Sequence, residues 1–262
     1  MSMWTKPCID GKSHGFSSIE KMIESTILAC NVVKQHYDEV YFYTDERGYE
    51  WITPYLEQLP FTSIEVVMDN INWLSDDCWS LSKIYVYSLQ KEPFIHIDND
   101  VFIWEKFSEE LVKKDFLFQE IEYINDGYFF YLEAIEFFKN ILPKEITIYD
   151  GAFNCGVFGC FTNESLELIK KYYEVAYEFV KKTKEIPSTS DGLKRKLSSV
   201  FIEQLFIYSL IMDSNLKYEI LRKYPLMEYK IKYTHQLSMT KRNEVVENMI
   251  RDRVYFKNWK AN

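Results

Sequence analysis

The sequence predicts an α/β protein in which a mostly parallel β-sheet is flanked by helices. Two patterns in the 262 residues support this: short apolar runs rich in aromatic and β-branched residues, and longer segments whose apolar residues recur at helical spacing. The two kinds of segment alternate along most of the chain, which is typical of wound parallel sheets. The only linker-like stretch, 186–192, is too short to separate two domains, so we expect one domain over 1–262.

The N-terminal part of the chain shows this alternation most regularly. Ser17 and Glu20 form a capping-box pattern in front of an apolar helical face that includes Ile19 and Ile23. Residues 45–48 combine charged residues with a glycine and are expected to form a turn. The expected elements are a strand at 2–9, a helix from Ser17, a strand at 39–44, a short helix at 51–59, a strand at 64–68, a helix at 79–90 and a strand that ends at Asp98.

The alternation continues through the rest of the chain. The stretch 146–161 holds three of the eight glycines in an apolar setting, where glycine lets the backbone approach a ligand or another strand closely. The expected elements are a short helix near 108–114, a strand at 116–119, helices at 131–142, 164–182 and 199–212, and strands near 217–221 and 227–233.

Composition restricts the partners and the compartment. The net charge is −9 and the pI is about 5.1, so we expect no nucleic-acid partner, because a phosphate backbone selects basic surfaces. Aromatic residues make up 17% of the chain, which suits sugar or base stacking but fits a thick core better. The five cysteines form no CxxC pair, and no stretch has the length of a signal-peptide core or a membrane helix. We therefore expect a soluble, cytoplasmic protein.

The stretch from Pro93 to Ile103 places two carboxylates inside an apolar run. Asp98 and Asp100 lie two positions apart where a predicted strand ends, and open α/β sheets bind ligands at that edge. Two like charges in such a run need a counter-charge, which a divalent cation with oxygen ligands usually supplies. The alternative is an acidic turn that only connects two strands.

Four features between residues 77 and 241 resemble the GT-A glycosyltransferases, most closely the glycogenin-like enzymes of family 8. The segment SKIYVYSLQKEPFIHIDNDVFI, 82–103, is similar to the lysine-bearing helix and the strand that lead into the DxD motif of that family. FNCGVF at 153–158 resembles the family's FNSGVF, and Glu203 with Gln204 stands where the family has an Asp-Gln pair. His235 with Lys241 resembles the closing HxxGxxKPW element.

The resemblance implies a single Rossmann-related GT-A domain and a retaining, metal-dependent transfer of a sugar from a nucleoside diphosphate donor, UDP favoured. The acceptor, whether a glycan, a lipid-linked molecule or a protein, stays open. The implied metal is Mn²⁺ or Mg²⁺, and a histidine ligand favours Mn²⁺. The implied roles are metal binding for Asp98, Asp100 and His235, donor binding for Lys83, Asn99, Asn154, Gly156 and Lys241, and a catalytic place beside the sugar for Glu203 and Gln204.

Several of these residues have simpler explanations. His235 is also explained as a packed histidine, and Lys83 as a surface lysine on a helix. Asn154 precedes Cys-Gly and is equally a turn former, and the Glu203-Gln204 pair is also explained as a backbone cap. Two other functions compete with catalysis of sugar transfer: a GT-A domain that binds nucleotide sugar or glycan without turnover, and a metal-dependent nucleotidyltransferase. The chain lacks the glycine- and lysine-rich phosphate loop expected of the latter.

The C-terminal segment 243–262 is predicted as a helical or basic-aromatic extension. It interleaves basic and aromatic side chains, namely Arg251, Arg253, Tyr255, Phe256, Lys257, Trp259 and Lys260. Such a segment can dock on an anionic membrane surface, which would suit a lipid-linked acceptor and a location peripheral to the membrane. The simpler alternative is a helix that packs its aromatic residues onto the domain.

Overall fold

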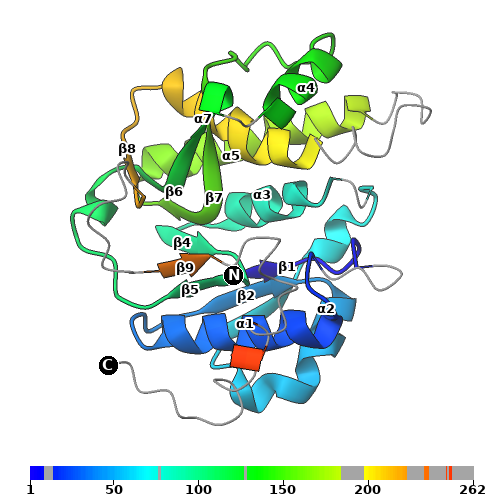
Figure 1. Cartoon of the computed structure of the whole chain (residues 1–262), viewed down its shortest axis with the longest axis vertical. Coiled ribbons are helices and arrows are strands. Elements are labelled where there is room, and N and C mark those ends of the chain that lie inside the picture. The colour runs from blue at the N-terminus through cyan, green and yellow to red at the C-terminus, as the bar shows by residue number, and fades with distance from the viewer. Residues whose placement is uncertain are drawn as a thin grey trace. The chain divides into compact units, whose positions relative to one another are not determined.

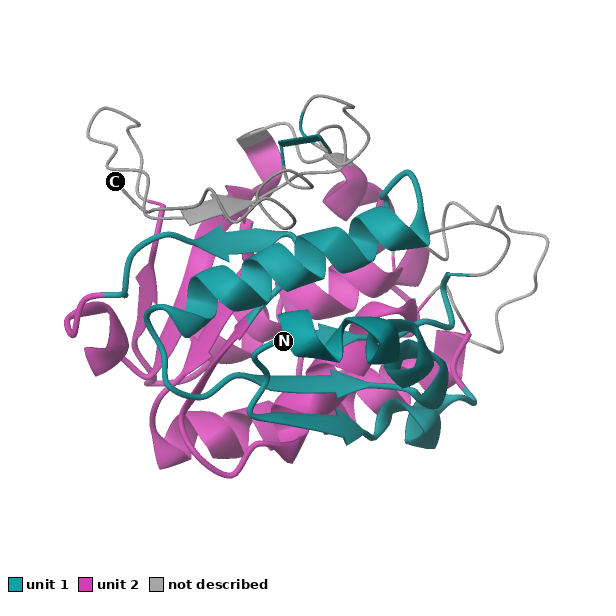
Figure 2. Cartoon of the chain, turned by 90° about the horizontal axis from the view of Figure 1, so that it is seen from below, with its two compact units in different colours: residues 1–73, 97–107, 226–262 teal, residues 74–96, 108–225 magenta. Residues whose placement is uncertain are grey.

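The computed structural model describes residues 1–8, 14–75, 78–126, 129–183, 198–222, 233–235, 246 and 248–249 (Figure 1). Helices alternate with strands, so the predicted α/β class is confirmed. The chain divides into two compact units, coloured separately in Figure 2. Unit 1 comprises Met1–Trp73, Ile97–Phe107 and Leu226–Asn262, and unit 2 comprises Leu74–His96 and Ser108–Pro225. Each unit consists of stretches that are not contiguous in the sequence. The single domain over 1–262 stays a prediction.

Unit 1 contains a three-stranded parallel sheet in the order β1-β2-β3. The strands are β1, Ser2–Met3, β2, Tyr41–Thr44, and β3, Ser63–Val66. They are connected by α1, Ile19–Lys34, and by α2, Glu46–Ile52, which the 3-10 helix Thr53–Gln58 continues. Because a helix leads from each strand to the next parallel one, this part of the chain has the predicted β–α–β–α–β order.

A two-stranded antiparallel ladder also belongs to unit 1. It pairs β5, Val101–Ile103, with β9, Tyr233–His235. Helix α1 packs against β5. Strand β9 covers only the last residue of the predicted strand 227–233, and residues 227–232 lie outside the described part of the chain.

Three local predictions in unit 1 are wrong. The N-cap of α1 is Ser18 rather than Ser17, since Ser18 Oγ accepts the backbone N–H of Lys21 at 3.3 Å. Residues 45–48 begin α2 instead of forming a turn, because Asp45 caps that helix by accepting the N–H of Gly48 at 2.9 Å. The strand predicted over 2–9 ends at Met3, and a backbone bond from Cys8 to the carbonyl of Thr5 (2.8 Å) then closes a turn.

Unit 2 contains most of a four-stranded sheet in the order β4-β7-β6-β8. The strands are β4, Phe94–Ile97, β6, Phe116–Tyr123, β7, Gly151–Cys160, and β8, Tyr218–Ile220. Strand β6 runs antiparallel to β7 and parallel to β8, so this sheet is mixed. The mostly parallel GT-A sheet expected from the sequence therefore stays a prediction.

The helices of unit 2 lie close to their predicted positions. They are α3, Ser80–Leu89, α4, Phe129–Phe138, α5, Asn163–Thr183, and α7, Phe206–Met212, which follows the π-helical segment Phe201–Leu205. The short helix predicted near 108–114 is the 3-10 turn Leu111–Lys113. Helix α3 packs against α5, and both α7 and the π-helical segment pack against β7.

Aromatic side chains form much of the core of unit 2. Phe118 of β6 stacks on Phe153 of β7 with ring centroids 3.9 Å apart, and Tyr87 stacks on Phe158 at 4.4 Å. Gly159 permits this close strand packing, because a Cβ there would lie 2.9 Å from the Cβ of Leu117. These rings therefore serve the core, as the composition favoured. Among the described residues, no helix is long and apolar enough to cross a membrane.

Candidate functional site

The two predicted metal-binding carboxylates lie in a tight turn of unit 1 between β4 and β5. The N–H of Val101 donates to the carbonyl of Asp98 at 3.0 Å and closes the turn. Asp98 is half-buried, whereas Asp100 is only 4% exposed. The local structure is therefore an acidic turn between two strands, as the alternative predicted. A carboxylate as buried as Asp100 is nevertheless unusual in a turn that only connects two strands.

Asn99, at the centre of this turn, anchors it to two other elements of unit 1. Its side-chain Nδ2 donates to the backbone carbonyl of Ser2 in β1 at 3.0 Å. The backbone carbonyl of Asn99 accepts a hydrogen bond from the hydroxyl of Ser25 in α1 at 2.9 Å. Its Oδ1 is buried and accepts no hydrogen bond from the described residues. These contacts hold the two carboxylates in place whether or not Asn99 also binds a donor.

The backbone of His235 lies beside the acidic turn. In the antiparallel pairing of β9 with β5, His235 is opposite Val101, which directly follows Asp100. The ladder thus joins two segments that are far apart in the sequence, as the implied metal site requires. The side chain of His235 and all of Lys241 lie outside the described part of the chain. Among the described side chains, no three His, Cys, Asp or Glu residues lie together as ligands for one metal ion.

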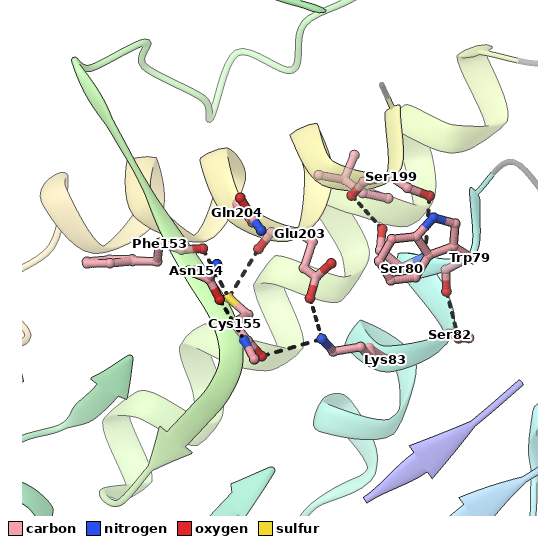
Figure 3. A network of polar contacts seen from close by, with 12 residues as sticks. Trp79, Ser80, Ser82, Lys83, Phe153, Asn154, Cys155, Ser199, Glu203 and Gln204 are labelled. Carbon is pink, nitrogen blue, oxygen red and sulfur yellow. Dashed lines mark hydrogen bonds and ion pairs between the residues drawn. The ribbon is translucent and has the colours of Figure 1, made fainter. Parts of the chain in front are cut away.

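A buried ion pair connects two of the predicted site residues in unit 2 (Figure 3). Lys83 of α3 bonds to Glu203 of the π-helical segment, and the two side chains are only 9% and 4% exposed. The Lys83 Nζ also donates to the carbonyl of Cys155 in β7 at 3.4 Å. Lys83 is therefore not a surface lysine.

The local helix geometry explains how Glu203 comes to face α3. Residues Phe201–Leu205 form a π-helical turn, a rare geometry that is frequent at functional sites. The hydroxyl of Tyr172 donates to the carbonyls of Ile202 and Glu203 at 2.8 and 2.9 Å, so α5 supports the widened turn. The turn directs Glu203 inward while Gln204, the next residue, is half-buried.

A second buried carboxylate, Glu122 of β6, organises the rest of this cluster. Its Oε1 accepts the Nδ2 of Asn154 at 2.7 Å, and its Oε2 accepts the hydroxyl of Tyr131 at 2.8 Å. The Tyr131 hydroxyl also contacts the side-chain amide of Gln204. Burial and the charge of Glu122 raise the pKa of Tyr131 far above its usual range, so this hydroxyl keeps its proton.

Neither Glu122 nor Tyr131 was among the site residues predicted from the sequence. The strand was expected to end at Gln119, although the residues that follow, EIEY, keep a strand-like alternation up to Tyr123. Register explains the contact: Glu122 is paired with Ala152, and Asn154 lies two residues further along β7 on the same face. An acidic residue within a strand-like run was the available signal.

Asn154 and Gly156, both predicted donor-binding residues, are buried in β7. The Oδ1 of Asn154 accepts the N–H of Gly156 at 3.1 Å within this strand, so the alternative of a turn former is wrong. With its amide also bonded to Glu122, Asn154 is held by protein groups on both sides. These bonds favour a structural role for Asn154 inside the strand.

The predicted site residues therefore fall into two groups. In unit 1, Asp98, Asn99 and Asp100 share one turn, with the backbone of His235 beside it. In unit 2, Lys83 pairs with Glu203, and Asn154 is connected to Gln204 through Glu122 and Tyr131.

The fold and the candidate site residues describe an α/β protein. It has an acidic turn in unit 1 and a buried charged cluster in unit 2. The chain belongs to the family of unknown function DUF6734, which matches residues 1–259. No curated protein matches the chain.

Proposed function

We propose that this chain is a metal-dependent glycosyltransferase of the GT-A type, which moves a sugar from a nucleoside diphosphate, UDP in the first instance, to an acceptor. The pairing of β5 with β9 is the observation that carries this proposal. It supports the proposal because His235 lies opposite Val101, the residue that directly follows the Asp98–Asp100 turn, although the two are far apart in the sequence.

The chemistry of these residues suits a divalent cation. Two carboxylates within one closed turn repel each other, and burying Asp100 costs free energy that a cation would offset. An imidazole nitrogen as third ligand favours Mn²⁺ over Mg²⁺. Asp98, Asp100 and His235 are thus the residues that would hold the metal.

In the proposed reaction, the bond between the anomeric carbon of the sugar and the diphosphate oxygen breaks, and both electrons leave with the diphosphate. The acceptor hydroxyl forms the new bond to that carbon, with retained configuration, and gives up its proton to the departing diphosphate. The bound cation would supply positive charge to the departing diphosphate. The chain itself holds the two carboxylates in their closed turn.

Glu203 and Lys83 have a supporting part in this proposal. Each neutralises the other in a buried site, so neither is a free nucleophile or a free cation. Their bond fixes the π-helical turn that carries Gln204. We therefore propose that Lys83 and Glu203 hold α3 and the π-helical segment of unit 2 together rather than contact the donor.

Thermal unfolding with UDP, GDP, CDP and dTDP, each with and without Mn²⁺, tests the binding part of the proposal. We expect one diphosphate to stabilise the chain only when Mn²⁺ is present, by about 2.7 kcal/mol at a hundredfold excess over its Kd. A chain that none of the four stabilises contradicts the proposal.

A second assay separates catalysis from binding alone. We expect Mn²⁺-dependent hydrolysis of the sugar nucleotide whose diphosphate stabilises the chain, because water can replace the acceptor hydroxyl. Stabilisation without any hydrolysis or transfer would instead support a GT-A domain that binds nucleotide sugar without turnover.

A further inference from the structure

Unit 2 contains an aromatic strip, which comprises Tyr123, Tyr149, Phe153, Tyr208 and Tyr218. Tyr123 ends β6, is 44% exposed and pairs with Gly151, the first residue of β7. A Cβ on Gly151 would lie 2.9 Å from the Cζ of Tyr208 and 3.0 Å from its hydroxyl oxygen. The glycine therefore lets Tyr208 of α7 lie against β7 at the position that pairs with Tyr123.

Phe153 of β7 forms the floor of the aromatic strip. Its ring centroid lies 4.7 Å from that of Tyr208 and 4.8 Å from that of Tyr218 in β8. Tyr149 contacts Tyr208 in turn, with ring centroids 6.4 Å apart. Phe153 is fully buried, whereas Tyr149 and Tyr218 are half-buried. The strip thus combines a closed aromatic floor with phenol side chains that are partly open to solvent.

The polar groups of the aromatic strip are phenols and carboxylates. The hydroxyl of Tyr149 donates to the Oδ1 of Asp213, an exposed residue that follows α7. Burial raises the pKa of Tyr208 to about 12, and the nearby Tyr218 and Asp150 raise it further. These phenols therefore keep their protons at neutral pH and can both donate and accept hydrogen bonds.

Three hydroxyls of the strip are available to a ligand. Within the part of the chain that the structure describes, the hydroxyls of Tyr123, Tyr208 and Tyr218 make no hydrogen bond. The hydroxyls of Tyr131 and Tyr172, which are buried elsewhere in unit 2, each donate to a group of the same unit. Because a tyrosine in contact with a protein core usually finds a partner for its hydroxyl, three unbonded hydroxyls in one strip indicate a binding surface.

A neutral ligand with many hydroxyl groups suits the chemistry of this surface. The C–H faces of a sugar pack on aromatic rings, and its hydroxyls bond to phenols and carboxylates. A phosphate would instead select cationic side chains. A quaternary ammonium group would need an open cage of rings, but Tyr208 and Tyr218 both contact Phe153 directly, so these rings pack on one another.

We propose that the aromatic strip of unit 2 is a binding site for a neutral oligosaccharide. Tyr123 supplies the most exposed ring, and the hydroxyls of Tyr208 and Tyr218 supply hydrogen bonds. All residues of the strip belong to unit 2, so this binding requires neither the acidic turn of unit 1 nor a metal ion. The inference goes beyond the proposed function and does not depend on it.

Calorimetry in EDTA, without nucleotide, tests this site with cellohexaose, maltohexaose and mannohexaose. We expect at least one of them to bind with a millimolar or tighter Kd, and Tyr123→Ala to weaken that binding about tenfold through loss of the ring. Tyr208→Phe and Tyr218→Phe keep the rings and should each weaken it about threefold, because each removes one hydroxyl. Tyr41→Ala is the control, since Tyr41 is 40% exposed in unit 1 and its loss should leave the affinity unchanged.

Aromatic ¹H–¹³C NMR of the full chain locates the bound saccharide. The signals of Tyr123, Tyr208 and Tyr218, assigned with the three variants, should shift during the titration, whereas the signals of Tyr37 in unit 1 should not. Shifts confined to other tyrosines overturn the inference.

Two further results overturn the inference: binding of none of the three saccharides, and an unchanged affinity in all three variants of the strip. Choline is titrated in the same way, and choline binding without saccharide binding would replace the oligosaccharide by a cationic ligand. A chain that binds a saccharide but no nucleoside diphosphate with Mn²⁺ keeps this inference and contradicts the proposed function, so the two failures are distinguishable.

Discussion

The two units hold their buried carboxylates in different ways. In unit 2, Glu203 meets the ammonium group of Lys83, and Glu122 accepts two hydrogen bonds from side chains of the same unit. In unit 1, Asp98 and Asp100 share one turn and carry the same charge. The first arrangement uses its charges to hold elements together, whereas the second places two acidic residues two positions apart in one turn. We therefore expect substitutions in unit 2 to reduce stability first, and substitutions in unit 1 to reduce ligand binding first.

The largest expected effect is on stability, at the buried ion pair of unit 2. Glu203→Ala leaves the ammonium of Lys83 buried without its counter-charge, so the free energy of unfolding should fall by about 3–5 kcal/mol in urea denaturation. The control is Glu167→Ala on α5, which removes an exposed pair with Lys170 (2.6 Å) and should cost at most about 1 kcal/mol. Equal losses in the two variants would show that burial does not distinguish the pairs.

The next effect is on binding, at the acidic turn of unit 1. Asp98→Asn and Asp100→Asn each remove one charge with little change of shape, and the Mn²⁺-dependent affinity for UDP should fall about a hundredfold, roughly 2.7 kcal/mol. Calorimetry measures this, and urea denaturation checks that the variants stay folded. Asp38→Asn, at an exposed position of the same unit, is the control and should bind normally. Normal affinity in both turn variants would remove the metal site from the proposal.

A smaller effect is expected at His235. If its imidazole is the third ligand, His235→Ala should weaken Mn²⁺ binding about tenfold, or roughly 1.4 kcal/mol. His36→Ala is the comparison, because the Nε2 of His36 is bonded to the carbonyl of Trp104 at 2.8 Å and its loss should change only the melting temperature. A change in melting temperature alone for His235→Ala would favour a packed histidine.

The last prediction compares the two cores at alkaline pH. Burial raises the pKa of Cys30 in α1 and of Cys160 in β7 to about 12 each. Because the unfolded thiol ionises near its ordinary pKa of about 9 and the folded one does not, each thiol destabilises the fold as pH rises from about 9 to 12, by up to about 1.4 kcal/mol per pH unit. Cys30→Ala and Cys160→Ala should each reduce this slope in urea denaturation. A slope that changes for only one variant would show that the units respond to pH differently.

The helices are the part of the fold that the sequence predicted best, because their apolar spacing is a signal that is local in the sequence. Apolar spacing predicted α1, α3 and α5 to within a few residues, because a helix that buries one face repeats its pattern over several turns. Strand ends and caps were less accurate. Ser17 and Ser18 offer the same hydroxyl, and only the final path of the chain decides which one meets the N–H of Lys21.

For the candidate site, the sequence by itself determined which residue types are available and where the two carboxylates interrupt an apolar run. That suffices to predict Asp98 and Asp100 in a turn, because the residues are neighbours in sequence. Only the tertiary structure decided that Lys83 meets Glu203, that Glu122 reaches Asn154 and Tyr131, and that His235 lies opposite Val101. These contacts join residues far apart along the chain, and they depend on strand register and on one π-helical turn. A shift of one residue in register would turn each side chain to the other face of its strand.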